Sequence, residues 1–314
     1  MKKLFFTLFV LIFLSACSAS AQPAKLKIAV LPVLDSLPLY VAQQQNYFQK
    51  NGVEVELVSV ASAPERDQLM QSGQVDGMLN EVVSTILYNR EETRVVILRF
   101  ARTASKEAPI FRLLAAKDSG IKTPQDLKDV PIGISQGTVI EYTTDRILSK
   151  AGVAEADIKK MAVPKIPDRM ALLSSGKLKA AVLPDPLASL AIQNGAVNVI
   201  DDTTYPEVSN SVWSFSVKSV KNNPDAVRRF MASVEQAVQS INADNAKWSD
   251  LMTELKLVPP PLKDKYVISD FPLASVPNES QFADALAWLK GKGLIQKDVT
   301  YKDMVDASFF PASQ

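Results

Sequence analysis

Two segments of the 314-residue chain share one pattern: PERDQLMQSG at residues 64–73 and PDRMALLSSG at residues 167–176. Proline, arginine, leucine and a closing Ser-Gly pair recur in both at one offset of 103 residues. A Ser-Gly pair after a helix pattern is typical of a helix end. A spacing of about 100 residues is too long for a solenoid repeat, so the pattern predicts two similar lobes. Chance similarity between two generic α/β units is the alternative.

Strands and helices are predicted to alternate around each copy of the pattern. In the first half the predicted strands are residues 26–31, 53–60 and 75–79, and the predicted helices are residues 37–48 and 62–71. The second half repeats the order, with strands at 132–134 and 178–183 and a helix over 139–150. This β-α-β-α-β order indicates a parallel sheet with helices on its faces.

Two further apolar runs, residues 110–116 and 212–217, predict strands that carry the chain into the second lobe and back. The expected fold class is α/β, with two similar lobes, each a mostly parallel sheet flanked by helices, joined by two crossover strands. The expected first lobe is residues 25–111 and 212–314, and the expected second lobe is residues 112–211. Helices that begin near Asn223 and near Ser280 are expected to cover the first lobe.

The N-terminus has the pattern of a secretory signal. Two lysines precede the apolar run 4–14, which is too short to span a bilayer. Leu14-Ser15-Ala16-Cys17 resembles the lipobox of bacterial lipoproteins, in which the cysteine becomes the lipid-modified first residue. We therefore expect a signal peptide over residues 1–16 and a lipid-anchored tether over residues 17–24. An ordinary signal peptide with a chance cysteine is the alternative.

The composition excludes several classes of function. The chain has 35 basic and 34 acidic residues, no histidine and one cysteine. A Ser-His-Asp triad, a histidine metal site, a thiolate zinc site and an intrachain disulfide are therefore impossible. A net charge of +1 argues against a nucleic-acid partner. We expect no catalytic residues, no metal and no cofactor.

Seven short motifs, in this order, resemble one bacterial family. They are KIAV at 27–30, PLYVA at 38–42, YF at 47–48, GVEVEL at 52–57, SGQVD at 72–76, TPQDLK at 123–128 and PDP at 184–186. The family is the type II periplasmic substrate-binding proteins of ABC transporters, in the branch of the nitrate, sulfonate, taurine and thiamin-pyrimidine-precursor binders. The resemblance covers residues 25 to about 310. The cysteine-rich motif of the yeast pyrimidine-precursor synthases on this fold is absent.

The resemblance implies a monomeric lipoprotein that closes two lobes on a small molecule and delivers it to an ABC transporter permease. It would lie in the periplasm or on the outer face of the cell envelope, held to the membrane by a lipid on Cys17. The rival hypotheses are a sensor lipoprotein of the same fold and an enzyme on this fold.

Ligands of such sheets lie beyond the carboxyl ends of the strands, beside helix N-termini. The expected ligand-binding residues are Asp35, Ser36, Leu37, Asn80, Glu81 and Arg102 in lobe one, and Gln136, Gly137, Thr138 and Asp185 in lobe two. Several have a structural alternative: Asp35 or Ser36 as a helix cap, Glu81 as a first-turn acid, and Arg102 as a surface charge. Gly137 gives either backbone access to the ligand or a turn.

Acidic side chains outnumber Arg102 in these loops. Asp35, Glu81 and Asp185 carry carboxylates, and Glu141 adds a fourth unless its role is structural, as its capping-box position favours. This balance favours a nitrogen-rich heterocycle or an amine over nitrate or a sulfonate. Anion binding by helix N-termini alone is the alternative.

Overall fold

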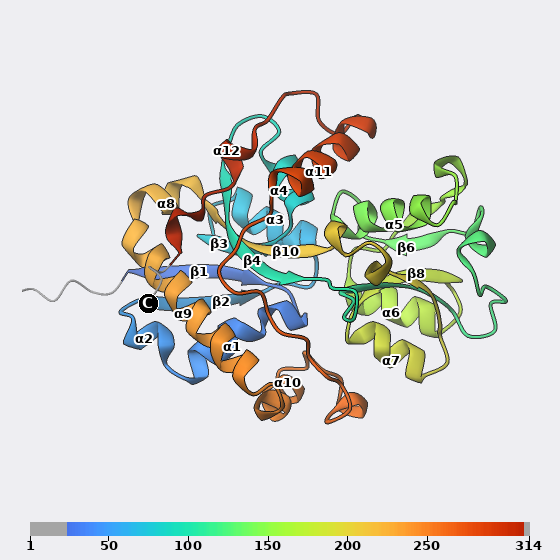
Figure 1. Cartoon of the computed structure of the whole chain (residues 1–314), viewed down its shortest axis with the longest axis horizontal. Coiled ribbons are helices and arrows are strands. Elements are labelled where there is room, and N and C mark those ends of the chain that lie inside the picture. Colours follow the sequence, from blue (N-terminus) through green and yellow to red (C-terminus); the bar gives the residue numbers. More distant parts are fainter. Residues whose placement is uncertain (1–23, 311–314) are drawn as a thin grey trace, which may run out of the picture.

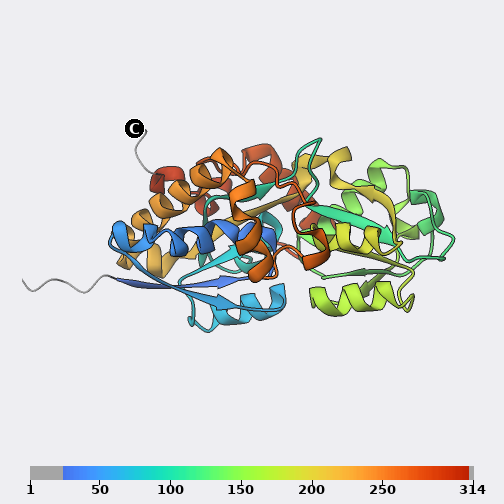
Figure 2. The same cartoon turned by 90° about the horizontal axis from the view of Figure 1, so that it is seen from below.

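The computed structural model describes residues 24–310 of the chain. The expected signal peptide, Cys17 and nearly all of the tether lie outside the described residues. The described part forms two five-stranded sheets, which lie side by side along the longest axis of the molecule (Figure 1, Figure 2). Among the described residues, no helix combines the length and the apolar character that a bilayer crossing requires.

The first sheet has the strand order β2-β1-β3-β10-β4. Its strands are β1 (Lys25–Val30), β2 (Glu54–Ser59), β3 (Gly77–Asn80), β4 (Val95–Thr103) and β10 (Asn210–Ser216). β1 pairs in parallel with β2 and β3, whereas β10 lies antiparallel between β3 and β4.

The second sheet repeats this plan in the order β7-β6-β8-β5-β9. Its strands are β5 (Phe111–Ala115), β6 (Ile132–Ile134), β7 (Lys160–Ala162), β8 (Ala180–Pro184) and β9 (Val197–Asp201). β6 pairs in parallel with β7 and β8, and β5 lies antiparallel between β8 and β9. Each sheet therefore receives a crossing strand, β10 or β5, as its antiparallel member. The predicted fold class is confirmed.

Helices cover both sheets. They are α1 (Leu37–Gln44), α2 (Tyr47–Lys50), α3 (Ala63–Gln71), α4 (Val82–Tyr88), α5 (Val139–Lys150), α6 (Ile166–Ser174), α7 (Leu187–Gln193), α8 (Val217–Asn222), α9 (Pro224–Ala243), α10 (Ser249–Glu254), α11 (Glu279–Gly291) and α12 (Tyr301–Met304). The repeated sequence pattern forms α3 and α6, whose bounds differ by the same 103 residues. At the start of α3 the Ser62 side chain accepts a hydrogen bond from the Glu65 N–H and so caps the helix.

The prediction of one helix over residues 37–48 is wrong. α1 ends at Gln44, and α2 begins at Tyr47, after Asn46 adopts a left-handed conformation with φ of 58°. Asparagine tolerates this conformation better than most residues, so it can break the helix without a glycine. The alternative role of Ser36 as a side-chain cap is not realised: Ser36 holds the N-cap position of α1, but its hydroxyl donates to the Leu31 carbonyl and accepts nothing from the helix.

The core of the first lobe forms under α9. Phe230 on α9 stacks on Phe48, with ring centroids 5.7 Å apart, and meets Trp213 and Phe215 of β10 edge-on at 6.3 and 5.2 Å. Phe230, Trp213 and Phe215 are fully buried. Aromatic pairs in these geometries add to the stabilisation from buried area. The crossing strand β10 is thereby held rigidly in the first lobe.

The helix α11 contacts both lobes. It packs on α4 of the first lobe, and its Asp284 accepts two hydrogen bonds of 2.9 Å from Arg146 and one from Tyr142, both on α5 (Figure 1). The indole N–H of Trp288 donates to Asp145 at 3.0 Å. The expectation that the C-terminal helices cover only the first lobe is therefore too simple, because α11 also fastens α5.

Candidate functional site

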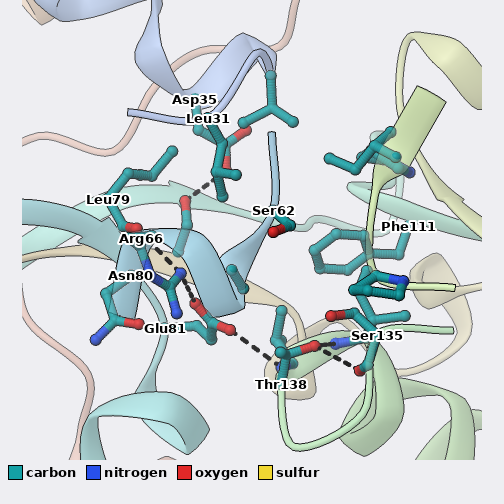
Figure 3. A pocket seen from close by; sticks show the side chains of 18 of the residues that line it. Leu31, Asp35, Ser62, Arg66, Leu79, Asn80, Glu81, Phe111, Ser135 and Thr138 are labelled. Carbon is teal, nitrogen blue, oxygen red and sulfur yellow. Dashed lines mark hydrogen bonds and ion pairs between the residues drawn. The ribbon is translucent and has the colours of Figure 1, made fainter. Parts of the chain in front are cut away.

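A cavity of about 70 Å3 lies between the two lobes (Figure 3). Its polar lining residues are Asp35, Ser62, Arg66, Asn80, Glu81 and Ser211 from the first lobe, and Ser135, Thr138 and Arg169 from the second. Apolar side chains, among them Leu31 and Phe111, line the rest of its wall. Most of these residues follow the carboxyl end of a strand or open a helix, which is where ligands bind in open α/β sheets.

Four of the ten expected site residues line this cavity: Asp35, Asn80, Glu81 and Thr138. Their contact with a ligand remains a prediction. Ser36, Leu37, Arg102, Gln136, Gly137 and Asp185 lie outside its lining. Leu37 is buried in the apolar core of the first lobe, and Gln136 is exposed.

Two residues outside the lining have clear structural roles. Gly137 has φ of 68°, a left-handed turn that favours glycine, and its N–H donates to Glu141 at 2.8 Å. Asp185 accepts the Ser189 N–H at 2.9 Å in the first turn of α7. Its other oxygen meets Arg112 at 3.1 Å.

Asp35 is fixed from two sides. Its carboxylate lies 3.5 Å from the Arg102 guanidinium and accepts the Ser211 hydroxyl at 2.6 Å. Arg102 is buried, so it is not the surface charge of the alternative. This arginine neutralises the carboxylate beside the cavity.

Glu81 reaches across the cleft between the lobes. Its Oε2 lies 2.8 Å from Nη1 of Arg66, and its Oε1 accepts the Ser84 hydroxyl at 2.7 Å. The same Oε1 accepts the N–H of Val139, the first residue of α5, at 3.3 Å (Figure 3). A carboxylate is stabilised at a helix N-terminus by the free N–H groups and the helix dipole. Glu81 therefore links the first lobe to a helix of the second.

Arg66 and Arg169 line the cavity although neither was predicted as a site residue. Both are 1% exposed. Nη1 of Arg66 donates to the Leu79 carbonyl at 3.1 Å, and Nε of Arg169 donates to the Val182 carbonyl at 2.7 Å. The two carbonyls are separated by the offset of the repeat. The arginine repeated at one offset could have indicated these site residues. Helix periodicity alone, however, does not predict that its side chain points toward the sheet.

The expected carboxylates each have a basic partner. Asp35 and Glu81 pair with arginines as described, Asp185 pairs with Arg112, and Glu141 pairs with Lys160 at 2.8 Å. The preference for a nitrogen-rich heterocycle or an amine assumed that these carboxylates have no basic partners. The structure contradicts that assumption, so the charge balance no longer supports the preference.

By contrast, no described carboxylate lies within ion-pair distance of Arg169. Burial lowers the pKa of its guanidinium to about 10, which still leaves it protonated at neutral pH.

Besides Nη2 of Arg66, which lies 2.9 Å from Asp67, two buried polar atoms at the cavity lack hydrogen-bond partners among the described residues. They are Oγ of Ser135, after β6, and Oδ1 of Asn80, at the end of β3. The Asn80 amide nitrogen is already used, because it donates to the Thr85 hydroxyl at 2.9 Å. Buried polar atoms in native proteins are almost always hydrogen-bonded, so these two indicate places for ligand atoms or water.

Two repeated lobes with a polar cavity between them define a periplasmic binding protein fold. The family model "NMT1/THI5 like" matches residues 34–247, more than half of the chain, and the chain belongs to this family. The resemblance to type II substrate-binding proteins is thus confirmed for the family and the fold. Lipid anchoring at Cys17 remains a prediction.

The fold is similar to that of the alkanesulfonate-binding protein SsuA from Xanthomonas axonopodis pv. citri bound to MOPS. The TM-score is 0.77 at 18% identity, covering 91% of this chain and 99% of that one. The periplasmic nitrate-binding protein NrtA from Synechocystis PCC 6803 matches with a TM-score of 0.72 at 13% identity, covering 91% of this chain and 86% of that one.

A curated relative in sequence is the 4-amino-5-hydroxymethyl-2-methylpyrimidine phosphate synthase of Schizosaccharomyces pombe. It is 26% identical over 121 residues, which cover 38% of this chain and 34% of the relative. The chain spans less than half the length of each curated relative that it matches, between 34% and 48%. The likeness to the solved structures shows the fold alone.

Proposed function

We propose that the protein is an extracytoplasmic solute-binding lipoprotein that captures a small molecule between its lobes and delivers it to an ABC importer. The observation that carries this proposal is the cavity itself, where polar side chains of both lobes converge. Asn80 and Glu81 come from the first lobe, and Ser135 and Arg169 from the second. A site divided in this way binds fully only when the lobes are together.

The proposed mechanism is hinge closure. Two stretches of chain connect the lobes, one between β4 and β5 and one between β9 and β10. Rotation about two such connections opens the cavity to solvent, and closure encloses the ligand. Because only the closed form offers contacts from both lobes, a ligand shifts the population toward it. The permease would then recognise the closed form.

The proposed anchor is a lipid on Cys17, and the proposed partner is an ABC transporter permease that meets a monomeric protein at the membrane. We further propose that the protein is not an enzyme. The relative in fission yeast is a synthase, so an enzyme on this fold is the alternative hypothesis. The absence of histidine and the location of the only cysteine at residue 17 support the binding hypothesis.

Native mass spectrometry of the protein expressed from residue 18 tests the proposal. A small molecule that co-purifies and is released unchanged on unfolding supports a binding protein. A thermal-shift screen with the identified molecule then checks affinity, since ligand at about 100 times its Kd stabilises by about 2.7 kcal/mol. A bound molecule that is converted to a product of different mass would overturn the proposal and favour the enzyme.

A further inference from the structure

The internal repeat reveals an uncompensated positive charge at the cavity. Arg66 and Arg169 hold equivalent positions on α3 and α6, and each donates to the equivalent carbonyl, Leu79 or Val182, at the same offset. The two arginines differ in what surrounds the rest of the guanidinium.

Arg66 has two carboxylate partners inside its own lobe. Asp67 lies 2.9 Å from its Nη2, and Glu81 lies 2.8 Å from its Nη1. At the offset of 103 residues, Asp67 corresponds to Met170 and Glu81 corresponds to Pro184. The second lobe therefore keeps the arginine and its carbonyl partner but replaces both carboxylates by uncharged residues.

Arg169 is nevertheless firmly placed. Its Nε donates to Val182 at 2.7 Å and its Nη1 donates to the Val163 carbonyl at 2.7 Å. Among the described residues no group accepts a hydrogen bond from its Nη2. The guanidinium lines the cavity while almost the whole side chain is buried. A buried cation needs a counter-charge, and residues 24–310 supply none within ion-pair distance of Arg169.

Two polar atoms, one on each side of the cavity, could bind other parts of a ligand whose anionic group pairs with Arg169. Ser135 belongs to the same lobe as Arg169; its hydroxyl has no partner in the described part of the chain and can donate to the same anion. Across the cleft, Oδ1 of Asn80 is a buried acceptor to which no group of the described residues donates. The cavity thus offers positive charge and a hydroxyl donor in one lobe, and a hydrogen-bond acceptor in the other.

We propose that Arg169, with Ser135, binds the anionic oxygens of a small organic acid whose opposite end presents an N–H or O–H donor to Asn80. This inference rests on the proposed function and names its ligand class. Arginine suits the task because its planar fork matches carboxylate and sulfonate oxygens. Nitrate and simple alkyl acids lack the donor and are expected to bind more weakly.

The repeat also suggests a test that leaves every proposed ligand contact in place. Met170→Asp puts a carboxylate at the position equivalent to Asp67, where it can neutralise Arg169 from within the protein. Met170→Asn is the matched control, with the same shape and no charge. Met170 is half-buried and lies outside the cavity lining, so both variants carry the same packing loss.

The probes are four acids: propionate, β-alanine, ethanesulfonate and 2-aminoethanesulfonate, titrated by calorimetry with nitrate as a fifth. The carboxylate and sulfonate arms distinguish the two kinds of anion. We expect at least one amino-substituted acid to bind more tightly than its unsubstituted partner and than nitrate. Met170→Asp should weaken that binding about tenfold or more relative to Met170→Asn.

Equal affinity of the two Met170 variants would overturn the role of Arg169. Failure of the unmodified protein to bind any of the four acids would overturn the ligand class. Both results leave the proposed function intact if native mass spectrometry still finds a co-purified neutral or cationic molecule. The function itself fails only if the protein retains no small molecule or converts the one it binds.

Discussion

The carboxylate of Glu81 accepts a hydrogen bond from the backbone N–H of Val139 at 3.3 Å, across the boundary between the lobes. Glu81 belongs to the loop before α4, and Val139 opens α5. The same carboxylate neutralises the buried Arg66 at 2.8 Å. One side chain therefore couples the charge balance of the first lobe to the position of a helix in the second.

Glu81→Gln is expected to loosen this coupling. The amide keeps the shape of the side chain but leaves Arg66 with only Asp67 as a counter-charge and weakens the contact with α5. Breaking a buried ion pair from one side typically costs about 3 kcal/mol or more. Urea unfolding should report that loss, and small-angle scattering should give a larger radius of gyration for the ligand-free protein.

The control for this prediction is Glu54→Gln, which removes an exposed carboxylate paired with Lys25 on the surface of β2. Exposed pairs contribute little, so its stability and radius should stay close to those of the parent. An unchanged radius for Glu81→Gln would mean that other contacts hold the lobes together.

Asp284→Asn is expected to weaken the attachment of α11 to α5. The substitution removes the charge that Arg146 contacts at 2.9 Å from two of its nitrogens. Both side chains are partly exposed, so the free energy of unfolding should fall by only about 1 kcal/mol. Hydrogen exchange across residues 279–291 should nevertheless become faster, because α11 keeps only the Trp288–Asp145 hydrogen bond of the two polar attachments to α5 described above.

Asp298→Asn is the matched control. Asp298 pairs with Lys290 near the end of the same helix, but on the surface and without contact to α5. Faster exchange in both variants alike would show that α11 responds to any lost charge and would contradict its role as a link between the lobes.

The buried carboxyl of Asp202 predicts a pH dependence. Burial raises its pKa to about 7, although it accepts the N–H groups of Ile110 and Phe111 at the start of β5. The folded state then binds a proton that the unfolded state, with its ordinary pKa of 3.8, has released. Stability from this group is therefore complete below about pH 4 and is lost as the pH rises to about 7, by at most about 4 kcal/mol.

Melting curves of the parent and of Asp202→Asn between pH 4 and 8 measure this effect. The variant is expected to be less stable at pH 4, where its amide replaces a well-placed carboxyl, but its melting temperature should change less with pH. Two parallel curves would mean that Asp202 does not titrate in this range.

Cys17→Ser tests the proposed anchor. Without the thiol no lipid can be attached, so the protein should leave the membrane fraction or accumulate as an unprocessed precursor. Several acyl chains together hold a protein stably on a membrane, whereas a free polar tether does not. Fractionation followed by immunoblotting gives the answer, and membrane partition equal to that of the parent would disprove lipid anchoring at this cysteine.

The fold could be predicted because its signals are local and occur twice. The Ser-Gly helix ends and the Pro-x-Arg starts place α3 and α6 at one offset, and the strands around them follow from short apolar runs. The helix break at Asn46 was not predicted, because an asparagine within a helix pattern does not by itself indicate a left-handed conformation. The helix that begins near Ser280 could be predicted, but not that it contacts both lobes.

The site was predicted less completely for a physical reason. Strand ends locate the loops, which is why the candidates Asn80, Glu81 and Thr138 do line the cavity, while their contact with a ligand stays a prediction. The charge of the cavity depends on which groups pair through space, and the partners of Asp35 and Glu81 are assigned only by the tertiary structure. The sequence repeat shows Arg169, but only the structure shows that no described carboxylate lies within ion-pair distance of it.

The way the crossing strands are shared sets an order of assembly during synthesis. All five strands of the second sheet lie within residues 111–201, so this lobe can complete itself as soon as that stretch has emerged. The first sheet must wait for β10, residues 210–216, because β4 joins β3 only through it. The first sheet, whose strands are synthesised first, is thus completed last. Until most of the chain has been made, its unpaired strand edges are accessible to chaperones and prone to aggregation.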